Sequence, residues 1–371
     1  MTILAGAAIF DGETLLRDHA LVLDGGRIAA LIPAGEAPPD ARRLPGGVIA
    51  PGLVDLQVNG GGGEMVGAGL DADRLARICA AQAPSGVLAC LPTLITDTPE
   101  TTAQVIAAGL EAARRRIPGF LGLHLEGPHL DPARAGAHDP ALIRPMDGED
   151  LARLCDAARA LPALMVTLAP ESATPEQIAA LASAGAVVSL GHTGCDYETA
   201  QAAIRAGARC ATHLFNAMSG LGHRAPGLVG AVLSGGLAAG LIADGHHVHP
   251  ATLAVALAAR PEGLFLVTDG MAFAGTDARE MRLQGRPIRR EGGRLTLADG
   301  TLAGADLTLP QAIARLVALG AAPARALAMA TSIPADLIGA GGRTGRIRPG
   351  RAADLVWMRP DWTVGGIWQA A

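Results

Sequence analysis

Seven polar residues in this chain lie at or near the carboxyl end of short apolar runs, and together they could carry hydrolytic chemistry. If the runs are parallel strands of one sheet or barrel, their carboxyl ends converge on one face, where the active sites of such folds lie. Side chains far apart in the sequence would then be neighbours. The seven residues are Gln57, Asn59, Glu126, His192, His213, Asp244 and Asp269.

Glu126, His192 and His213 form a complete ligand set for a catalytic zinc ion, which can be held by one carboxylate and two imidazoles. Such an ion keeps a fourth position open for water and lowers the pKa of that water to about 7. Asp269 could take the proton from the water as a general base and return it to the leaving group as a general acid. The set therefore predicts metal-assisted hydrolysis.

Each of these residues also has a plainer interpretation. A single histidine after a strand is more often a satisfied polar residue than a metal ligand, so the prediction depends on the whole set. Glu126 ends the apolar stretch FLGLHLEG, where an unpaired carboxylate would be costly to bury. His124, two residues earlier, points to the same strand face and is expected to belong to the core or to support the ligands.

Eight apolar runs alternate with segments of helical periodicity rich in Ala, Leu, Arg and Glu. This alternation predicts parallel strands joined by crossover helices, and eight strands favour a closed (β/α)8 TIM-like barrel over a doubly wound open sheet. Strands that are covered by helices and packed inside should be almost continuously hydrophobic, as these are. The runs are residues 47–58, 86–95, 120–126, 163–169, 186–192, 210–215, 238–244 and 264–269.

The segments between these runs predict helices, for which Thr98, Thr174 and Asp306 are the expected N-caps. Both chain ends instead show short strand and turn patterns, which predict that residues 1–50 and 345–371 form one small β domain beside a barrel of residues 51–344. Within the barrel, residues 278–301 predict a β insertion. The expected helices span about 71–84, 99–116, 148–160, 175–184, 196–206, 250–259, 306–319 and 323–338.

The composition excludes several other classes of function. The 371 residues are 50% hydrophobic and 18% charged, too apolar for a disordered chain, and the net charge of −5 argues against nucleic acid as a partner. All 30 basic residues are arginine, so no lysine can form a Schiff base, bind phosphate in a loop or bridge two metals. Five scattered cysteines and no secretory leader pattern predict a cytoplasmic protein, with no membrane association.

Six sequence motifs in series carry a family resemblance. The chain resembles the N-acetylglucosamine-6-phosphate deacetylases of the amidohydrolase superfamily, in the right order over nearly its whole length. PGLVD occurs across the superfamily, whereas HLEGP, THLFNAM and IADGHHV in series are typical of this branch. The motifs are PGLVDLQVNGGGG, GLHLEGPHL, GHTGCDY, THLFNAM, GLIADGHHVHP and LVTDGMAFAG.

This resemblance implies a metal-dependent barrel with a small β-sandwich built from both chain ends, which removes the acetyl group from a 6-phosphorylated amino sugar. By resemblance, Glu126, His192 and His213 are the metal ligands, Asp269 is the catalytic acid and base, and His138 is a second catalytic residue near the acyl group. The family completes its phosphate site across a dimer interface, so a homodimer is implied. The implied substrate contacts are Gln57, Ala137, His138, Asn216, Ala217, Arg224, His247, Leu302, Ala303 and Gly304.

The first strand departs from the wider superfamily, because Gln57 and Asn59 stand where many amidohydrolases carry His-x-His. Amide groups are poor zinc ligands compared with imidazoles. With the bridging lysine absent as well, we expect one divalent metal ion per subunit, zinc before iron or another ion.

The leading hypothesis is hydrolysis of N-acetylglucosamine 6-phosphate to glucosamine 6-phosphate and acetate. N-acetylgalactosamine 6-phosphate, its epimer, is a rival substrate, and the residues do not distinguish between the two sugars. An amidohydrolase acting on N-acyl amino acids is a more distant rival, in which Arg224 would bind a carboxylate in place of a phosphate. A rival of another class is an inactive barrel that senses phosphosugars, which the complete set of ligands and acid/base argues against.

Overall fold

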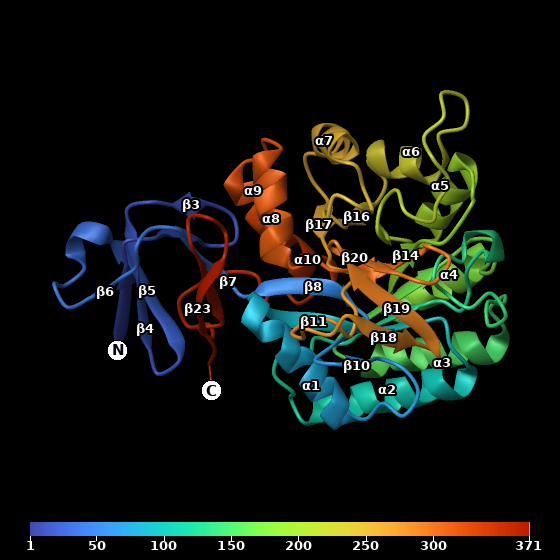
Figure 1. The fold of residues 1–371 in the computed structure, drawn as a ribbon, viewed down its shortest axis with the longest axis horizontal. Helices are drawn as coiled ribbons and strands as arrows, with labels where there is room; N and C mark the ends of the chain where they lie inside the picture. The colour runs from blue at the N-terminus through green and yellow to red at the C-terminus, as the bar shows by residue number, and fades with distance from the viewer. Residues whose placement is uncertain (371) are drawn as a thin grey trace.

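The chain folds around one barrel, which a computed structural model describes over residues 1–370. Eight parallel strands neighbour one another in chain order, which confirms the predicted (β/α)8 barrel (Figure 1). A bridge between Val58 and Gly270 links the first strand to the segment after the last. The strands are β8 (Leu53–Val58), β11 (Val87–Ile95), β12 (Leu123–Glu126), β13 (Leu164–Leu168), β14 (Val187–Leu190), β15 (Cys210–Ala211), β16 (Ala238–Leu241) and β17 (Leu264–Leu266).

Helices cover the outside of this barrel (Figure 1). The amphipathic helices bury an apolar stripe against the strands, as α1 does with Leu75 and Ile78. No helix within residues 1–370 is both long and apolar enough to cross a membrane. The helices are α1 (Ala72–Gln82), α2 (Pro99–Arg114), α3 (Gly148–Ala160), α4 (Pro175–Ser183), α5 (Tyr197–Ala206), α6 (Gly227–Leu233), α7 (Pro250–Ala259), α8 (Leu309–Ala318), α9 (Pro323–Ala328) and α10 (Ser332–Leu337).

Three details of the helices differ from the sequence expectations. Thr308 caps α8 through a reciprocal capping box, whereas Asp306, the expected cap, pairs with Arg290 of the inserted sheet. The single helix expected over 323–338 is two helices, because the backbone leaves the helical region at Thr331 (φ −139°, ψ −86°). Helix α6 was not expected, since its GLVGAVL sequence is almost wholly buried and so shows no amphipathic period.

The two chain ends lie side by side in two small sheets, of order β5-β4-β1-β6 and β23-β22-β7-β2-β3 (Figure 1). The run 47–58, expected as one strand, divides at Gly52 into β7 (Val48–Pro51) of a small sheet and β8 of the barrel. A Cβ at Gly52 would lie 2.6 Å from that of Leu88, so glycine is needed at this crossing. The other strands are β1 (Thr2–Ala5), β2 (Ala8–Phe10), β3 (Leu15–Leu16), β4 (His19–Asp24), β5 (Arg27–Pro33), β6 (Arg42–Arg43), β22 (Leu355–Met358) and β23 (Val364–Trp368). The domain boundaries 1–50, 51–344 and 345–371 stay a prediction.

An antiparallel sheet of order β18-β19-β20-β21 is inserted between the last barrel strand and α8. It packs on Ile95, at the end of β11, and on Met271 and Phe273, which follow β17, so it covers one side of the carboxyl end of the barrel. A short hairpin, β9 (Gly60–Gly61) and β10 (Glu64–Met65), follows β8. The strands of the inserted sheet are β18 (Glu280–Leu283), β19 (Arg286–Glu291), β20 (Arg294–Thr296) and β21 (Leu302–Ala305).

Candidate active site

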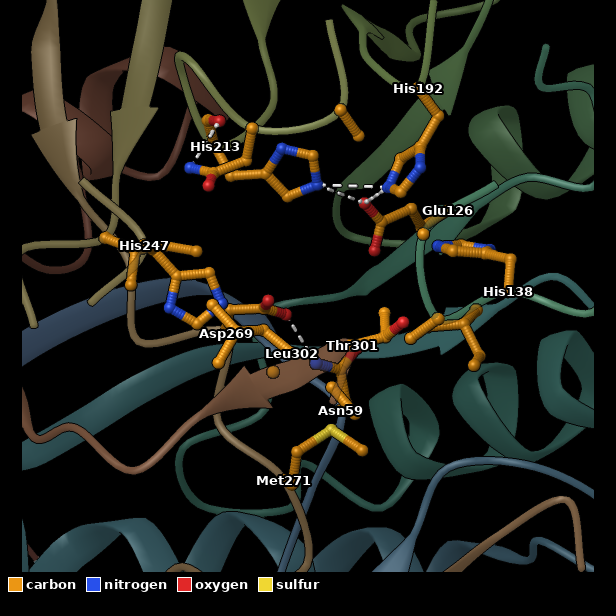
Figure 2. A pocket seen from close by; sticks show the side chains of 18 of the residues that line it. Asn59, Glu126, His138, His192, His213, His247, Asp269, Met271, Thr301 and Leu302 are labelled. Carbon is orange, nitrogen blue, oxygen red and sulfur yellow. Dashed lines mark hydrogen bonds and ion pairs between the residues drawn. The ribbon is translucent and has the colours of Figure 1, made fainter. Parts of the chain in front are cut away.

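A pocket opens at the carboxyl end of the barrel strands, between these strand ends and the inserted sheet (Figure 2). Most residues that the sequence pointed to as site residues line this pocket, although they come from loops far apart in the chain. The structure shows these residues around one pocket, whereas their roles remain predictions. The residues are Glu126, Ala137, His138, His192, His213, Asn216, Ala217, His247, Asp269, Leu302, Ala303 and Gly304.

Glu126, His192 and His213 direct three potential ligand atoms at one point (Figure 2). The Nε2 atoms of His192 and His213 lie 3.2 and 3.1 Å from Oε1 of Glu126 and 3.1 Å from each other. A tetrahedral ion with bonds of about 2.0–2.1 Å holds its ligands about 3.3 Å apart, close to these spacings. The three buried residues therefore fit a metal ion, in agreement with the donor set expected from the sequence.

The backbone presents His192, His213 and Asp269 in an uncommon conformation. Each lies two or three residues beyond the end of its strand and has a positive φ, of 48°, 33° and 51° respectively. A non-glycine residue in the left-handed region costs about 1–3 kcal/mol, and such residues cluster at functional sites. Backbone hydrogen bonds hold the carbonyl groups here, such as that from the Ala305 N–H to the oxygen of Asp269 at 3.0 Å.

A carbonyl group fixes the tautomer of His192. Its Nδ1 lies 2.8 Å from the oxygen of Arg134, at the end of the short 3-10 turn η3 (Pro132–Arg134). Because a carbonyl oxygen can only accept, Nδ1 carries the proton and Nε2 keeps its lone pair. This arrangement is typical of metal-binding histidines, whose second nitrogen donates to a protein oxygen.

Glu126 and His213 shift each other's pKa in opposite directions. Burial raises the pKa of Glu126, but its interactions with the adjacent His192 and His213 side chains outweigh this effect and hold the pKa well below the usual value. Burial lowers the pKa of His213, but the hydrogen bond and charge of Glu126 give a net rise. The carboxylate is thus ionised at neutral pH, as a metal ligand must be.

Two amide side chains hold the carboxylate of Asp269. Asn59 Nδ2 donates to Oδ1 at 2.6 Å, and Gln57 Nε2 donates to the same oxygen at 3.2 Å and to Glu126 Oε2 at 3.2 Å. Within residues 1–370, Oδ1 of Asn59 is buried and has no hydrogen-bond partner, so it can accept from a ligand. Burial raises the pKa of Asp269, and the nearby charge of Glu126 raises it further.

Asp55 fixes the backbone on which Asp269 stands. Its buried carboxylate accepts from the Thr268 hydroxyl at 2.6 Å and from the Thr268 and Gln57 N–H groups. Burial raises the pKa of Asp55 to about 7. On the other side, Gly304 (φ +65°) has no room for a Cβ, which would lie 2.6 Å from the carbonyl oxygen of Asp269. These contacts leave Asp269 little freedom.

His138 reaches the pocket from the loop after β12 and is oriented by Thr96. The Thr96 N–H donates to Nδ1 of His138 at 3.2 Å, and the Thr96 hydroxyl lies 2.7 Å from the same nitrogen. Nδ1 is therefore an acceptor, and the neutral ring carries its proton on Nε2. Burial, and next the nearby His192, lower the pKa of His138 to about 3, so the ring stays neutral. It can donate a hydrogen bond without gaining charge.

The opposite side of the pocket carries polar groups. His247 Nδ1 lies 2.6 Å from Asp244 Oδ2, and Asp244 also accepts from the His246 and His247 N–H groups. Asp244, which ends the seventh apolar run, therefore orients His247 rather than lining the pocket. Asn216 donates to the carbonyl groups of His213 and Leu214 in its own loop, at 3.2 and 3.4 Å.

Two predicted substrate contacts, Gln57 and Arg224, do not line the pocket. Gln57 is buried below it, where its amide bridges Glu126 and Asp269, because the first strand turns this side chain inward to a small cavity of the barrel interior. Arg224 lies exposed on the loop before α6. His124, expected to be core or support, is buried between Thr93 and Thr167 at 3.3 and 2.7 Å.

Some pocket residues had no signal in the sequence. The apolar ones, such as Ile95 and Leu283, look like ordinary core positions of a strand, and only the fold reveals that they face a cavity. The polar Asn59 was named among the strand-end residues, but no contact with metal or substrate was predicted for it. The lining residues without a predicted contact are Asn59, Ile95, Gly136, Ile242, Met271, Leu283 and Thr301.

Comparison with known families and proteins agrees with a metal-dependent amide hydrolase. Residues 48–366 match the amidohydrolase family, and residues 1–44 match the NagA composite domain. The chain is 40% identical over 331 residues to an N-acetylgalactosamine-6-phosphate deacetylase of Shewanella sp. (strain ANA-3), covering 88% of this chain and 83% of that protein. It is 33% identical over 369 residues to an N-acetylglucosamine-6-phosphate deacetylase of Haemophilus influenzae, covering 98% and 96%.

A solved structure shares the complete architecture. The N-acetylglucosamine-6-phosphate deacetylase of Pasteurella multocida superposes with a TM-score of 0.94 at 33% identity, over 100% of this chain and 98% of that one. Family match, relatives and fold thus agree with the buried carboxylate and imidazole cluster. The chain belongs to the amidohydrolase family of metal-dependent hydrolases.

Proposed function

We propose that this protein hydrolyses the acetamide of N-acetylglucosamine 6-phosphate, giving glucosamine 6-phosphate and acetate. The observation that carries this proposal is the assembly of a metal-ligand set, a carboxylate of raised pKa and a neutral histidine donor around one pocket. The named activities of the relatives supply the substrate class. A carboxylate acceptor and a neutral donor suit the two proton and charge requirements of amide hydrolysis.

Zinc is the ion we propose for Glu126, His192 and His213, because one carboxylate and two imidazoles are a common catalytic zinc set. When bound, such an ion supplies a water nucleophile of lowered pKa and polarises the scissile carbonyl. One ion per subunit is proposed, since Gln57 and Asn59 donate their amides to Asp269. Those amide nitrogens are not metal ligands.

The side chains around the cluster have separate roles in proton transfer and in hydrogen bonding to the substrate. Asp269 takes a proton from the attacking water and later gives it to the departing amine. Both amides bind Oδ1, so Oδ2 is the oxygen that accepts the proton in this proposal. His138 donates from Nε2 to the developing oxyanion, and its low pKa keeps it from competing for the proton. The unpaired Oδ1 of Asn59 accepts from the substrate N–H or the water.

The sugar and its phosphate occupy the polar side, near His247, Asn216 and Ala217, with Leu302, Ala303 and Gly304 as further contacts. We propose a homodimer in which Arg224 of one subunit binds the phosphate in the pocket of the other. Its exposure, outside the pocket of its own chain, supports this assignment. The neighbouring Leu221 side chain is 60% exposed, which suits an interface that covers this loop.

A second candidate substrate is N-acetylgalactosamine 6-phosphate, which differs in the orientation of one hydroxyl group. The 40% identity to a Shewanella protein named N-acetylgalactosamine-6-phosphate deacetylase favours it. Both substrates place the same acetamide over the same catalytic groups. The catalytic proposal therefore holds for either epimer.

Acetate release by the purified protein tests the proposal, with both 6-phosphorylated epimers, unphosphorylated N-acetylglucosamine and N-acetyl amino acids compared at equal zinc. We expect turnover of the phosphorylated sugars and a kcat/KM ratio that names the preferred epimer. Turnover of N-acyl amino acids alone would replace the phosphosugar assignment by the more distant amidase. Bound phosphosugar and bound metal without turnover of any amide would indicate the sensor.

A further inference from the structure

The pocket has an apolar end beside His138, to which the catalytic proposal assigns no role beyond the contact at Ala303. It is lined by Ile95, Met271, Leu283 and Ala303, and these residues pack together in one hydrophobic cluster that Ala137 also joins. All four are at most 9% exposed. The polar residues Asn216 and His247 also line the pocket, and Figure 2 shows His138 and His247 on opposite sides of it.

We infer that this apolar end is an acyl subsite and that Leu283, from the inserted sheet, sets the longest acyl group that the enzyme accepts. The inference rests on the proposed deacetylase function. An amide has two substituents, and the one on nitrogen carries hydroxyl groups and a phosphate that need the polar side. With the carbonyl oxygen at His138, the acyl carbon chain must extend toward the apolar end.

The anchors of His138 also anchor this subsite. Ile95 precedes Thr96, whose N–H orients His138, and Ala137 precedes His138 itself. Two separate backbone segments therefore place the apolar wall next to His138, the proposed hydrogen-bond donor to the substrate carbonyl. A carbonyl group placed on Nε2 of His138 has this wall within reach of its alkyl substituent.

The hairpin that carries Leu283 is hydrogen-bonded to two neighbouring backbone segments. Gln284 and Gly285 have positive φ values of 48° and 83° and form the two-residue turn between β18 and β19. Gln284 Nε2 donates to the Thr96 carbonyl at 2.8 Å, and Arg286 Nη2 donates to the Ala137 carbonyl at 2.5 Å. The hairpin tip is thus bonded to the two segments that hold His138, so Leu283 is a fixed wall.

A fixed wall predicts a steep dependence on acyl length. An additional methylene in a well-packed apolar site is poorly tolerated, and one methylene commonly changes kcat/KM by about 10–200-fold. We therefore expect N-acetyl substrates to exceed N-propionyl and N-butyryl substrates by at least about tenfold per methylene. Leu283→Ala should open the wall, and Leu283→Phe should narrow it.

The test measures kcat/KM for N-formyl, N-acetyl, N-propionyl and N-butyryl glucosamine 6-phosphate. Leu283→Ala should raise the butyryl to acetyl ratio at least about tenfold, and Leu283→Phe should lower the acetyl to formyl ratio. Met281→Ala is the matched control, because Met281 points to the same face of β18 and packs in the same cluster without lining the pocket. It should leave both ratios unchanged.

Ratios within one variant cancel losses of folded protein, and N-formyl turnover shows that each variant is active. Unchanged ratios in both Leu283 variants, or equal changes in Met281→Ala, would overturn the acyl subsite while leaving the deacetylase intact. If the wild-type enzyme hydrolyses none of the four amides, the proposed function fails, and this inference fails with it.

Discussion

The catalytic end and the sugar end of the pocket differ in how firmly the protein holds their side chains. At the catalytic end, Asp269 is held by Asn59 and Gln57, and His192 by a backbone carbonyl. At the sugar end, Asp244 holds His247, but Asn216 bonds only to carbonyl groups of its own loop, and Arg224 is exposed outside the pocket. This difference supports two proposals: that one chain holds all the groups for bond cleavage, and that a second subunit completes the phosphate site.

Loss of a metal ligand should break the catalytic end most severely. His213→Ala removes one of three donors, and we expect the variant to lose bound metal and about 10³-fold or more in kcat. His246→Ala is the control, because this imidazole does not line the pocket. Elemental analysis with acetate release measures both effects, and full activity of the metal-free variant would contradict the assignment.

Asp269→Asn should separate proton transfer from metal binding. The amide matches the carboxylate in size but cannot accept the proton, so kcat should fall by about 10²–10⁴-fold with metal content unchanged. Asp277→Asn, an exposed carboxylate in the loop that follows, should behave as wild type. Near-normal turnover of Asp269→Asn would remove Asp269 from the mechanism.

Arg224→Ala should affect the sugar end alone. Loss of a charged hydrogen bond to phosphate is expected to raise KM for the phosphorylated sugar by about 10–100-fold, with kcat changed little. Arg209→Ala removes another exposed arginine and should leave KM unchanged.

Mixing Arg224→Ala subunits with Asp269→Asn subunits should restore some activity if the phosphate site is shared between subunits. Sedimentation of the wild type should report a dimer.

The pH dependence offers the finest comparison. Asp269 must be ionised to accept a proton, and its pKa is raised by burial and by Glu126, so kcat/KM should fall as pH drops through this raised pKa. Asn59 donates to the ionised form and opposes the rise. Asn59→Ala should therefore move the acid limb to higher pH. Asn216→Ala should lower activity without moving the limb, and an unmoved limb in Asn59→Ala would show that another group titrates.

Much of the catalytic end could be predicted because its residues break a pattern. Glu126, His192, His213 and Asp269 are polar residues at the ends of apolar runs, and the barrel topology that those runs predict brings their ends together. Because burying a polar group without a partner is costly, a polar residue within an apolar run indicates a functional or paired position even in a single sequence.

The apolar end could not be predicted, because Ile95, Met271 and Leu283 keep the pattern of ordinary core residues. Leu283 comes from an inserted hairpin whose place depends on the ties of Gln284 and Arg286 to distant carbonyl groups. No local spacing encodes such ties. Similarly, Gln57 looked like a substrate contact, but the strand turns it inward to hold two carboxylates.

Titration of the metal-free protein with zinc tests the central claim most directly, with acetate release from N-acetylglucosamine 6-phosphate followed at each addition. The structure predicts that activity rises linearly and reaches its plateau at one equivalent per chain, since one three-donor cluster is found within residues 1–370. A plateau at two equivalents, or activity that does not depend on added metal, would contradict the single-ion site at Glu126, His192 and His213.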